Sequence, residues 1–294
     1  MKVAIYGKSF NPDFNEYIIE IFNILEKSKS QVSVFKNFFK YINERVKINN
    51  KENIKEFSSY QDFENDYDIF LSIGGDGTFL ESTAFVRDKG IPIAGINSGR
   101  LGFLANISKK DMKQALERIL NNSYSFEERE PIKLETPGKE FANENFAINE
   151  ITVQKTDSSS MITIHVYIDG QFLNTYWADG LIISTPTGST AYSLSAGGPI
   201  VAPNAKNYII TPLAPHNLTV RPIVIPNHHE LTLKIDGRDQ NYLVSLDHRH
   251  KVFSTSVELK IKKAEFKIKM LKHDDRTFYT TLREKLMWGL DKRN

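Results

Sequence analysis

A glycine-rich turn between an apolar run and a helix-like stretch constrains this sequence more than any other feature. The apolar run covers residues 67–72, the turn reads Ile-Gly-Gly-Asp-Gly-Thr over residues 73–78, and helical character continues to residue 89. Glycines let backbone N–H groups approach a ligand closely, and the start of a helix adds partial positive charge. The turn therefore indicates a phosphate site at the end of a β-strand.

Asp76 distinguishes this turn from a P-loop, which carries a lysine at the phosphates. A carboxylate beside a phosphate is repulsive unless it takes a proton or holds a metal ion. An ordinary turn with an aspartate cap is the alternative, and it is disfavoured because a turn needs far less glycine. Asp76 is therefore the candidate catalytic residue, and the candidate phosphate-donor loop consists of Gly74, Gly75, Gly77 and Thr78.

Composition excludes several classes of function. The chain has 294 residues, of which 40% are hydrophobic and 25% charged, as expected for a soluble globular protein of one large or two medium domains. A net charge of +2 gives no general attraction to nucleic acid or membrane, and no cysteine is present for disulfides, thiolate metal sites or nucleophiles. No apolar run reaches the ~18 residues that span a bilayer, so we expect a cytoplasmic protein that binds neither nucleic acid nor membrane.

Strand and helix signals alternate over the first hundred residues. Apolar residues at helical spacing over 14–27 predict a helix. This rhythm predicts an α/β N-terminal domain over residues 1–105 with a Rossmann-like parallel sheet, in which ligands bind at the carboxyl ends of strands. The predicted strands are 2–6, 31–35, 67–73 and 92–96.

The rhythm changes to alternating strands after residue 130. Asp169-Gly170 between two of them predicts a hairpin turn. We expect an all-β C-terminal domain over 106–272, built as an antiparallel sandwich. An amphipathic helix over 277–289 is expected to pack back on the first domain, which residues 273–294 complete. The predicted strands are 147–154, 161–168, 171–178, 230–235, 242–246, 257–262 and 266–271.

A second dense motif follows the apolar residues 181–183. Residues 184–191 are all small or polar, Tyr192 follows, and residues 195–199 read Ser-Ala-Gly-Gly-Pro. Such a run offers many hydroxyl and backbone donors without bulk, which suits a polar ligand lying against the chain. A flexible surface loop is the alternative, and Pro186 with the flanking apolar strand argues against it.

Asn149 and Glu150 interrupt the apolar stretch 146–153. Strand alternation would place the two side chains on opposite faces, so that one of them points inward. A buried acid or amide costs free energy unless it is paired. From these residues alone, a ligand site and an edge-strand or bulge site both stay open.

These motifs together resemble the NAD kinase family. Segments 74–78, 96–104, 149–150 and 179–199 are similar to the family's signature blocks, in the same order and at similar spacing. The Gly-Gly-Asp-Gly-Thr block alone is shared with diacylglycerol and sphingosine kinases and, more loosely, with phosphofructokinases. The Ser/Thr-rich block, which consists of residues 184–192 together with 195–199, resembles NAD kinases and not lipid kinases. The whole resemblance runs from about residue 67 to the end of the chain.

The resemblance implies an enzyme that phosphorylates the 2′-hydroxyl of the adenosine ribose of NAD and so makes NADP. It implies ATP, another nucleoside triphosphate or polyphosphate as donor, a divalent cation such as Mg²⁺, and a homodimer or homotetramer with NAD in a cleft between the two domains. Asp76 matches the family's catalytic acid, as the base or as a metal ligand, and the metal ligands stay unassigned. The implied NAD-contacting positions are Asp76, Gly77, Asn149, Glu150, Asp179, Thr190, Ala191, Tyr192, Ser193, Leu194, Ser195 and His248.

Two departures from the family pattern stand out. Trp177 stands two residues before Asp179, where many relatives carry a basic residue, and if that residue contacts NAD phosphate, a charge is missing here. Ala105-Asn106 stands where relatives often have Thr-Asp. Two other functions are kept as alternatives, a lipid or sugar-alcohol kinase of the same superfamily and a non-catalytic NAD(P)-binding regulator. The intact Asp76 argues against the regulator.

Overall fold

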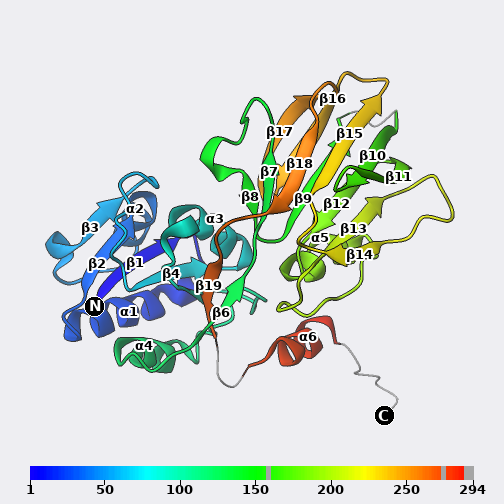
Figure 1. The fold of residues 1–294 in the computed structure, drawn as a ribbon. Helices are drawn as coiled ribbons and strands as arrows, with labels where there is room; N and C mark the ends of the chain where they lie inside the picture. Colours follow the sequence, from blue (N-terminus) through cyan, green and yellow to red (C-terminus); the bar gives the residue numbers. More distant parts are fainter. Residues whose placement is uncertain (157–159, 273–275, 288–294) are drawn as a thin grey trace, which may run out of the picture. The chain divides into compact units, whose positions relative to one another are not determined.

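A computed structural model describes residues 1–156, 160–272 and 276–287 (Figure 1). The contacts divide the chain into two compact units, Met1–Glu128 with Ile268–Asn294, and Arg129–Lys267. The first unit therefore extends beyond the predicted boundary at residue 105. Among the described residues, no helix is long and apolar enough to cross a bilayer.

The first unit is built on a sheet whose strand order is β3-β2-β1-β4-β5-β19-β6. The pairings from β3 through β5 are parallel, and so is that of β5 with β19, which confirms the predicted parallel sheet. The strands are β1 (Lys2–Gly7), β2 (Gln31–Phe35), β3 (Lys55–Phe57), β4 (Ile69–Gly74), β5 (Ile93–Asn97), β6 (Phe126–Arg129) and β19 (Ile268–Leu271).

Three of the helices that accompany these strands, α1, α2 and α4, bury apolar faces in one core. Helix α1 buries Ile18, Ile21, Phe22 and Leu25, a spacing of three and four residues that places all four side chains on one face. The helices are α1 (Asn15–Lys27), α2 (Lys36–Asn43), α3 (Asp76–Val86), α4 (Met112–Leu120) and α6 (Phe278–Leu286), with short 3-10 turns η1 (Pro12–Phe14), η2 (Lys51–Asn53) and η3 (Arg87–Lys89).

The second unit is an antiparallel sandwich, as predicted. Its two six-stranded sheets have the orders β11-β10-β15-β18-β7-β8 and β14-β13-β12-β9-β16-β17, and residues of both sheets form one core. The first sheet consists of β7 (Ile132–Glu135), β8 (Phe146–Ala147), β10 (Ile162–Ile168), β11 (Gln171–Ala178), β15 (Leu231–Gly237) and β18 (Leu259–Lys263). The second consists of β9 (Glu150–Lys155), β12 (Gly180–Ser184), β13 (Asn207–Leu213), β14 (Ile223–Pro226), β16 (Asn241–Leu246) and β17 (Arg249–Ser254).

The predicted hairpin turn is present between β10 and β11. Asp169 and Gly170 have φ angles of 48° and 81°, the left-handed pair that matches the twist of a two-residue hairpin. Three short helical turns complete this unit, η4 (Ala142–Glu144), η5 (Thr187–Thr190) and α5 (Tyr192–Ser195).

The strand predicted over 266–271 belongs to the other sheet. As β19 it pairs in parallel with β5, with Met270 opposite Ile93, and so lies in the first unit. Helix α4 lies within the range predicted for the second domain, but it too belongs to the first unit, where it packs against α1. Alternation shows that a segment is a strand, but it carries no information about which sheet supplies the partner.

Candidate active site

The glycine turn links β4 to α3 at the carboxyl end of the parallel sheet. A Cβ at Gly74 would lie 2.3 Å from Oγ1 of Thr78, so Gly74 is required by the packing of its own turn. A Cβ at Gly75 or Gly77 would meet no atom of the described residues within 4 Å, and both glycines are exposed. The backbone of the turn therefore faces open space at the start of a helix, where a phosphate can bind.

The carboxylate of Asp76, the first residue of α3, is held by three backbone N–H groups. Oδ2 accepts a hydrogen bond from Phe103 at 2.9 Å, and Oδ1 accepts one from Leu104 and one from Ala105, both at 2.9 Å. Nζ of Lys285 lies 3.9 Å from Oδ2. Asp76 thus ties the glycine turn to the signature segment 96–104 and to the residue that follows it. The sequence did not reveal this structural role.

The segment after β5 converges on the same turn. The N–H of Ser98 donates to the carbonyl of Gly74 at 3.1 Å, and Asn97 folds the segment through its own amide. A Cβ at Gly102 would lie 1.8 Å from Oδ1 of Asp76. After Gly74, Gly102 is therefore a second position of the site where packing requires glycine, because only glycine lets the chain approach the carboxylate so closely.

Polar groups from β1 and α3 lie at this edge too. Glu81 of α3 accepts a hydrogen bond from the Tyr6 hydroxyl at 2.6 Å and pairs with Lys8 at 2.6 Å. Burial, with the charge and hydrogen bond of Glu81, raises the pKa of Tyr6, so the phenol stays a donor. Glu81 is accordingly occupied by one residue of β1 and by the lysine that follows this strand.

In the second unit, Asp247 organises the turn that holds Asn149. Its carboxylate accepts N–H groups from Ile148 and Asn149 at 2.8 Å and from Glu150 at 3.2 Å. The prediction of one continuous strand over 147–154 is therefore wrong. β8 ends at Ala147, β9 begins at Glu150, and the turn held by Asp247 separates them. The family resemblance implied the adjacent His248 instead, and that side chain is exposed.

Glu150 is buried, with an exposed fraction of 8%, and its Oε2 has no hydrogen-bond partner among the described residues. Burial, with the nearby charge of Asp247, raises the pKa of Glu150 to about 8. The carboxyl is therefore mostly protonated at neutral pH and can donate a hydrogen bond. A buried, unpartnered carboxyl oxygen is a signal for a ligand, because leaving it unpaired costs free energy.

The Ser/Thr-rich block packs directly on the Asn149 turn. The Asn149 carbonyl accepts the N–H of Thr185 at 2.8 Å, and the Thr185 hydroxyl donates to the carbonyl of Ile148 at 2.6 Å. A Cβ at Gly188 would lie 2.2 Å from the Asn149 oxygen. The structure thus brings together two motifs that lie far apart in the sequence.

The residues predicted to line the NAD site have different exposures. Tyr192 is 43% exposed, with its hydroxyl accepting from Gln154 at 3.3 Å. The hydroxyl of Ser193 is buried and 3.0 Å from that of Thr211, so its side chain serves the packing of the unit. Ser195 is exposed, and the partly buried members of the block are Thr190, Ala191 and Leu194.

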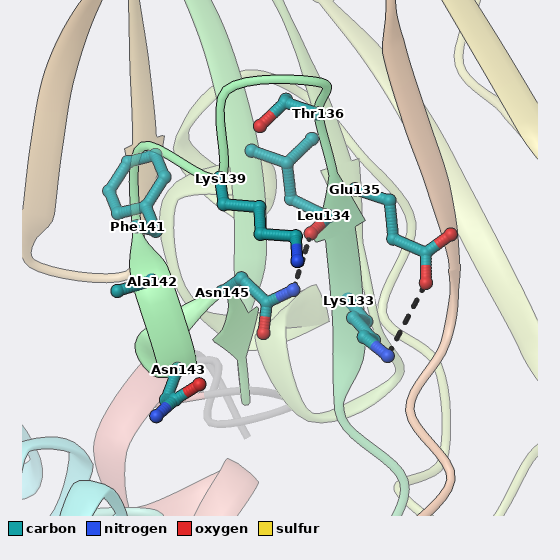
Figure 2. A pocket seen from close by; sticks show the side chains of 9 residues that line it. All are labelled: Lys133, Leu134, Glu135, Thr136, Lys139, Phe141, Ala142, Asn143 and Asn145. Atoms are coloured by element: carbon teal, nitrogen blue, oxygen red, sulfur yellow. Dashed lines mark hydrogen bonds and ion pairs between the residues drawn. The ribbon is translucent and has the colours of Figure 1, made fainter.

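A cavity of about 350 Å³ lies elsewhere in the second unit, beside β7 and η4 (Figure 2). Figure 2 shows the ion pair of Lys133 with Glu135 and the hydrogen bond from Asn145 to the carbonyl of Leu134. None of the predicted site residues lines this cavity. The lining residues are Lys133, Leu134, Glu135, Thr136, Lys139, Phe141, Ala142, Asn143 and Asn145.

Comparisons with known proteins identify the family of the chain. The ATP-NAD kinase N-terminal domain matches residues 5–124, and the ATP-NAD kinase C-terminal domain matches residues 148–273. The NAD kinase of Flavobacterium johnsoniae is 47% identical over 296 residues, covering 100% of both chains. The NAD kinase of Cytophaga hutchinsonii is 46% identical over 299 residues with the same coverage. The chain belongs to the NAD kinase family.

Solved structures show the same fold. Yeast NADH kinase complexed with NADH has a TM-score of 0.88 at 25% identity, covering 99% of this chain and 88% of that chain. An NAD kinase from Archaeoglobus fulgidus in complex with ATP has a TM-score of 0.74 at 24% identity, covering 96% and 99%. As a member of the NAD kinase family the chain is a kinase, and these matches favour neither a lipid or sugar-alcohol kinase nor a non-catalytic regulator.

Trp177 stands where the family resemblance leads us to expect a basic residue, and a lysine of β9 provides a positive charge near it in the sequence, at Asp179. The tryptophan is 52% exposed at the end of β11. Nζ of Lys155 lies 2.6 Å from Oδ1 of Asp179, whose side chain is 45% exposed. A positive charge is thus present beside Asp179, although the residue expected to carry it is apolar.

Proposed function

We propose that the chain transfers the terminal phosphoryl group of ATP to the 2′-hydroxyl of the adenosine ribose of NAD, giving NADP and ADP. The observation that carries this proposal is the pairing of Asp76 with an open glycine turn. A turn built for phosphate has a use for a carboxylate only when a proton must leave or a metal must be held.

In this reaction the 2′-hydroxyl gives its proton to Oδ2 of Asp76. The ribose oxygen forms a bond to the terminal phosphorus, the bond from that phosphorus to the bridging oxygen breaks, and ADP leaves with the electron pair. A positioned base typically contributes about 10²–10⁴-fold. Positioning and charge neutralisation supply most of the remainder.

The backbone N–H groups at Gly75 and Gly77 and the start of α3 would hold the donor phosphates. The described residues contain no group of three or more His, Cys, Asp or Glu side chains that could hold a metal ion. Mg²⁺ typically binds one or two carboxylates together with substrate phosphates, so Asp76 fits a metal that arrives on the donor. Such an ion would neutralise phosphate charge.

The second unit would bind NAD. The neutral carboxyl of Glu150 and the amide of Asn149 offer donors and acceptors to ribose hydroxyls or to the adenine edge. Asp179 would bind a polar group of the dinucleotide, and residues 190–195 would line the base pocket. The homodimer or homotetramer implied by the family resemblance and the cytoplasmic location expected from the apolar runs of the sequence belong to the same proposal. Light scattering after gel filtration tests the oligomeric state.

The test is a panel of donors and acceptors with product detection. ATP, GTP and polyphosphate are each combined with NAD, NADH, a diacylglycerol and a sugar alcohol, with and without Mg²⁺. NADH is included because the yeast neighbour is an NADH kinase. We expect NADP from ATP and NAD, with formation lost on addition of EDTA. Absence of NADP under every condition would overturn the proposal.

A further inference from the structure

The C-terminal helix carries a lysine to the candidate base. Lys285 lies in the last turn of α6, and its Nζ is 3.9 Å from Oδ2 of Asp76. The two side chains are 33% and 31% exposed, respectively. Because both border solvent, a ligand bound at the glycine turn can reach them together.

Helix α6 is fixed at its start and along one face. Thr277 and Thr280 cap it reciprocally, each hydroxyl accepting the N–H of the other residue, at 3.2 and 2.9 Å. The ring of Phe278 packs on that of Phe103 with centroids 6.1 Å apart, and Nζ of Lys285 lies 5.1 Å from the Phe103 centroid. Phe103 is the residue whose N–H binds Oδ2 of the candidate base, so α6 is anchored at the site itself.

The contacts of Asp76 leave one acceptor position open. A carboxylate has about four lone-pair positions. Two on Oδ1 and one on Oδ2 receive backbone N–H groups. The remaining position is on Oδ2, the oxygen nearer Lys285. At 3.9 Å the ammonium is beyond hydrogen-bonding distance, so it leaves that position free while placing positive charge beside it.

A donor phosphate at the glycine turn would meet the negative charge of Asp76. A P-loop avoids this problem, because it has no acid there and carries a lysine that reaches the phosphates. Lys8, which follows β1 directly, is paired with Glu81 at 2.6 Å. Lys285 contacts Asp76, so its positive charge lies where the donor phosphate would meet the carboxylate.

We propose that Lys285 binds the terminal phosphate of the donor, so that the C-terminal helix supplies the cation that a P-loop carries within the loop. This assignment rests on the proposed NAD kinase reaction. Lys285 makes and breaks no covalent bond, and the bonds exchanged are those of that reaction. Its charge is most effective as negative charge develops on the transferring group.

The test compares Lys285→Met, Lys285→Arg and a control, Arg283→Met, which removes an exposed charge from the same helix. For Lys285→Met we expect kcat/KM for ATP to fall roughly 10²-fold. We also expect the Kd for ATP-Mg²⁺ without NAD to rise several-fold by calorimetry, while KM for NAD stays within about threefold. Lys285→Arg should restore part of the loss, because it keeps the charge, and Arg283→Met should match the wild type.

Thermal unfolding of each variant separates a lost contact from a damaged fold. Wild-type values for Lys285→Met would overturn the assignment. A fourth variant, Arg100→Met, changes an exposed arginine in the segment after β5, and a loss in that variant alone would move the role to Arg100. A rise in turnover for Lys285→Met would instead make α6 inhibitory. If the wild type forms no NADP, the proposed function fails, whereas an active wild type with an equally active Lys285→Met removes only this inference.

Discussion

Asp247 and Glu150 hold each other through reciprocal hydrogen bonds. The N–H of Glu150 donates to Oδ1 of Asp247 at 3.2 Å, and the N–H of Asp247 donates to the carbonyl of Glu150 at 3.1 Å. The same carboxylate holds the two preceding residues of the turn, and its charge adds to the burial that raises the pKa of Glu150. One aspartate thus sets the shape of this part of the site and reinforces the effect of burial on the protonation of Glu150.

Asp247→Ala removes the acceptor of three backbone N–H groups. We expect it to lower the free energy of unfolding by about 2–4 kcal/mol and to weaken NAD binding, as measured by urea denaturation and by calorimetry. Asp236→Ala is the control, because that side chain is 77% exposed and pairs with His165 at the surface. We expect the control to cost less than about 1 kcal/mol, and equal losses in both variants would refute the role of Asp247.

Glu150 should make stability depend on pH. Its pKa is raised to about 8 in the folded protein, above the ordinary value of 4.5. The protonated carboxyl is favoured in the folded protein. Its contribution to the free energy of unfolding is therefore complete below pH 4.5 and is lost as the pH rises through 8. We expect the free energy of unfolding to fall by roughly 3–5 kcal/mol across this range, measured by urea denaturation at pH 5.5, 7.0 and 8.5.

Glu150→Gln should remove this fall, because an amide does not titrate. Glu135→Gln is the matched control, since hydrogen bonds from Lys262 and Lys133 lower the pKa of Glu135 and keep it ionised throughout the window. The control should keep the wild-type pH dependence. An unchanged slope in Glu150→Gln would show that another group titrates.

Gly102→Ala tests the placement of Asp76 without changing its chemistry. The added Cβ would lie 1.8 Å from Oδ1 of Asp76, so the carboxylate must move. Displacement of about 1 Å costs on the order of 10²-fold in rate, and we expect this loss in kcat for NADP formation. In Gly99→Ala the Cβ meets only Oδ1 of Asn97, at 4.0 Å, and kcat should stay within about twofold. Equal activity of the two variants would contradict the close approach at Gly102.

Asp76→Asn should lower kcat by roughly 10²–10⁴-fold, with the Kd for NAD within about threefold. The structure adds a second expectation. The asparagine carbonyl can keep the hydrogen bonds from Leu104 and Ala105, but its amide group then faces the N–H of Phe103. A modest loss of thermal stability should follow. Unchanged turnover would exclude Asp76 as the base, and a large loss of NAD affinity with normal turnover would make it a binding residue.

Much of the fold was predictable because its signals are local. The helix at Asn15–Lys27 and the hairpin at Asp169-Gly170 depend on side-chain spacing and on the left-handed preference of two adjacent residues. The sheet assignment of β19 was not predictable, because Ile268–Leu271 reads as a strand whichever sheet supplies its partner. The break before Glu150 was equally hidden, since its cause is a carboxylate about a hundred residues away in the sequence.

By itself the sequence determined the two-part architecture, the glycine turn with Asp76, and the family. The tertiary structure alone decided what surrounds Asp76. Its three backbone donors lie 27 to 29 residues further along, and Lys285 comes from the last described helix. A carboxylate accepts any donor that the fold brings within reach, and no local pattern encodes that choice. Asp247 was missed for the same reason, since its partners are backbone N–H groups, which every residue except proline carries.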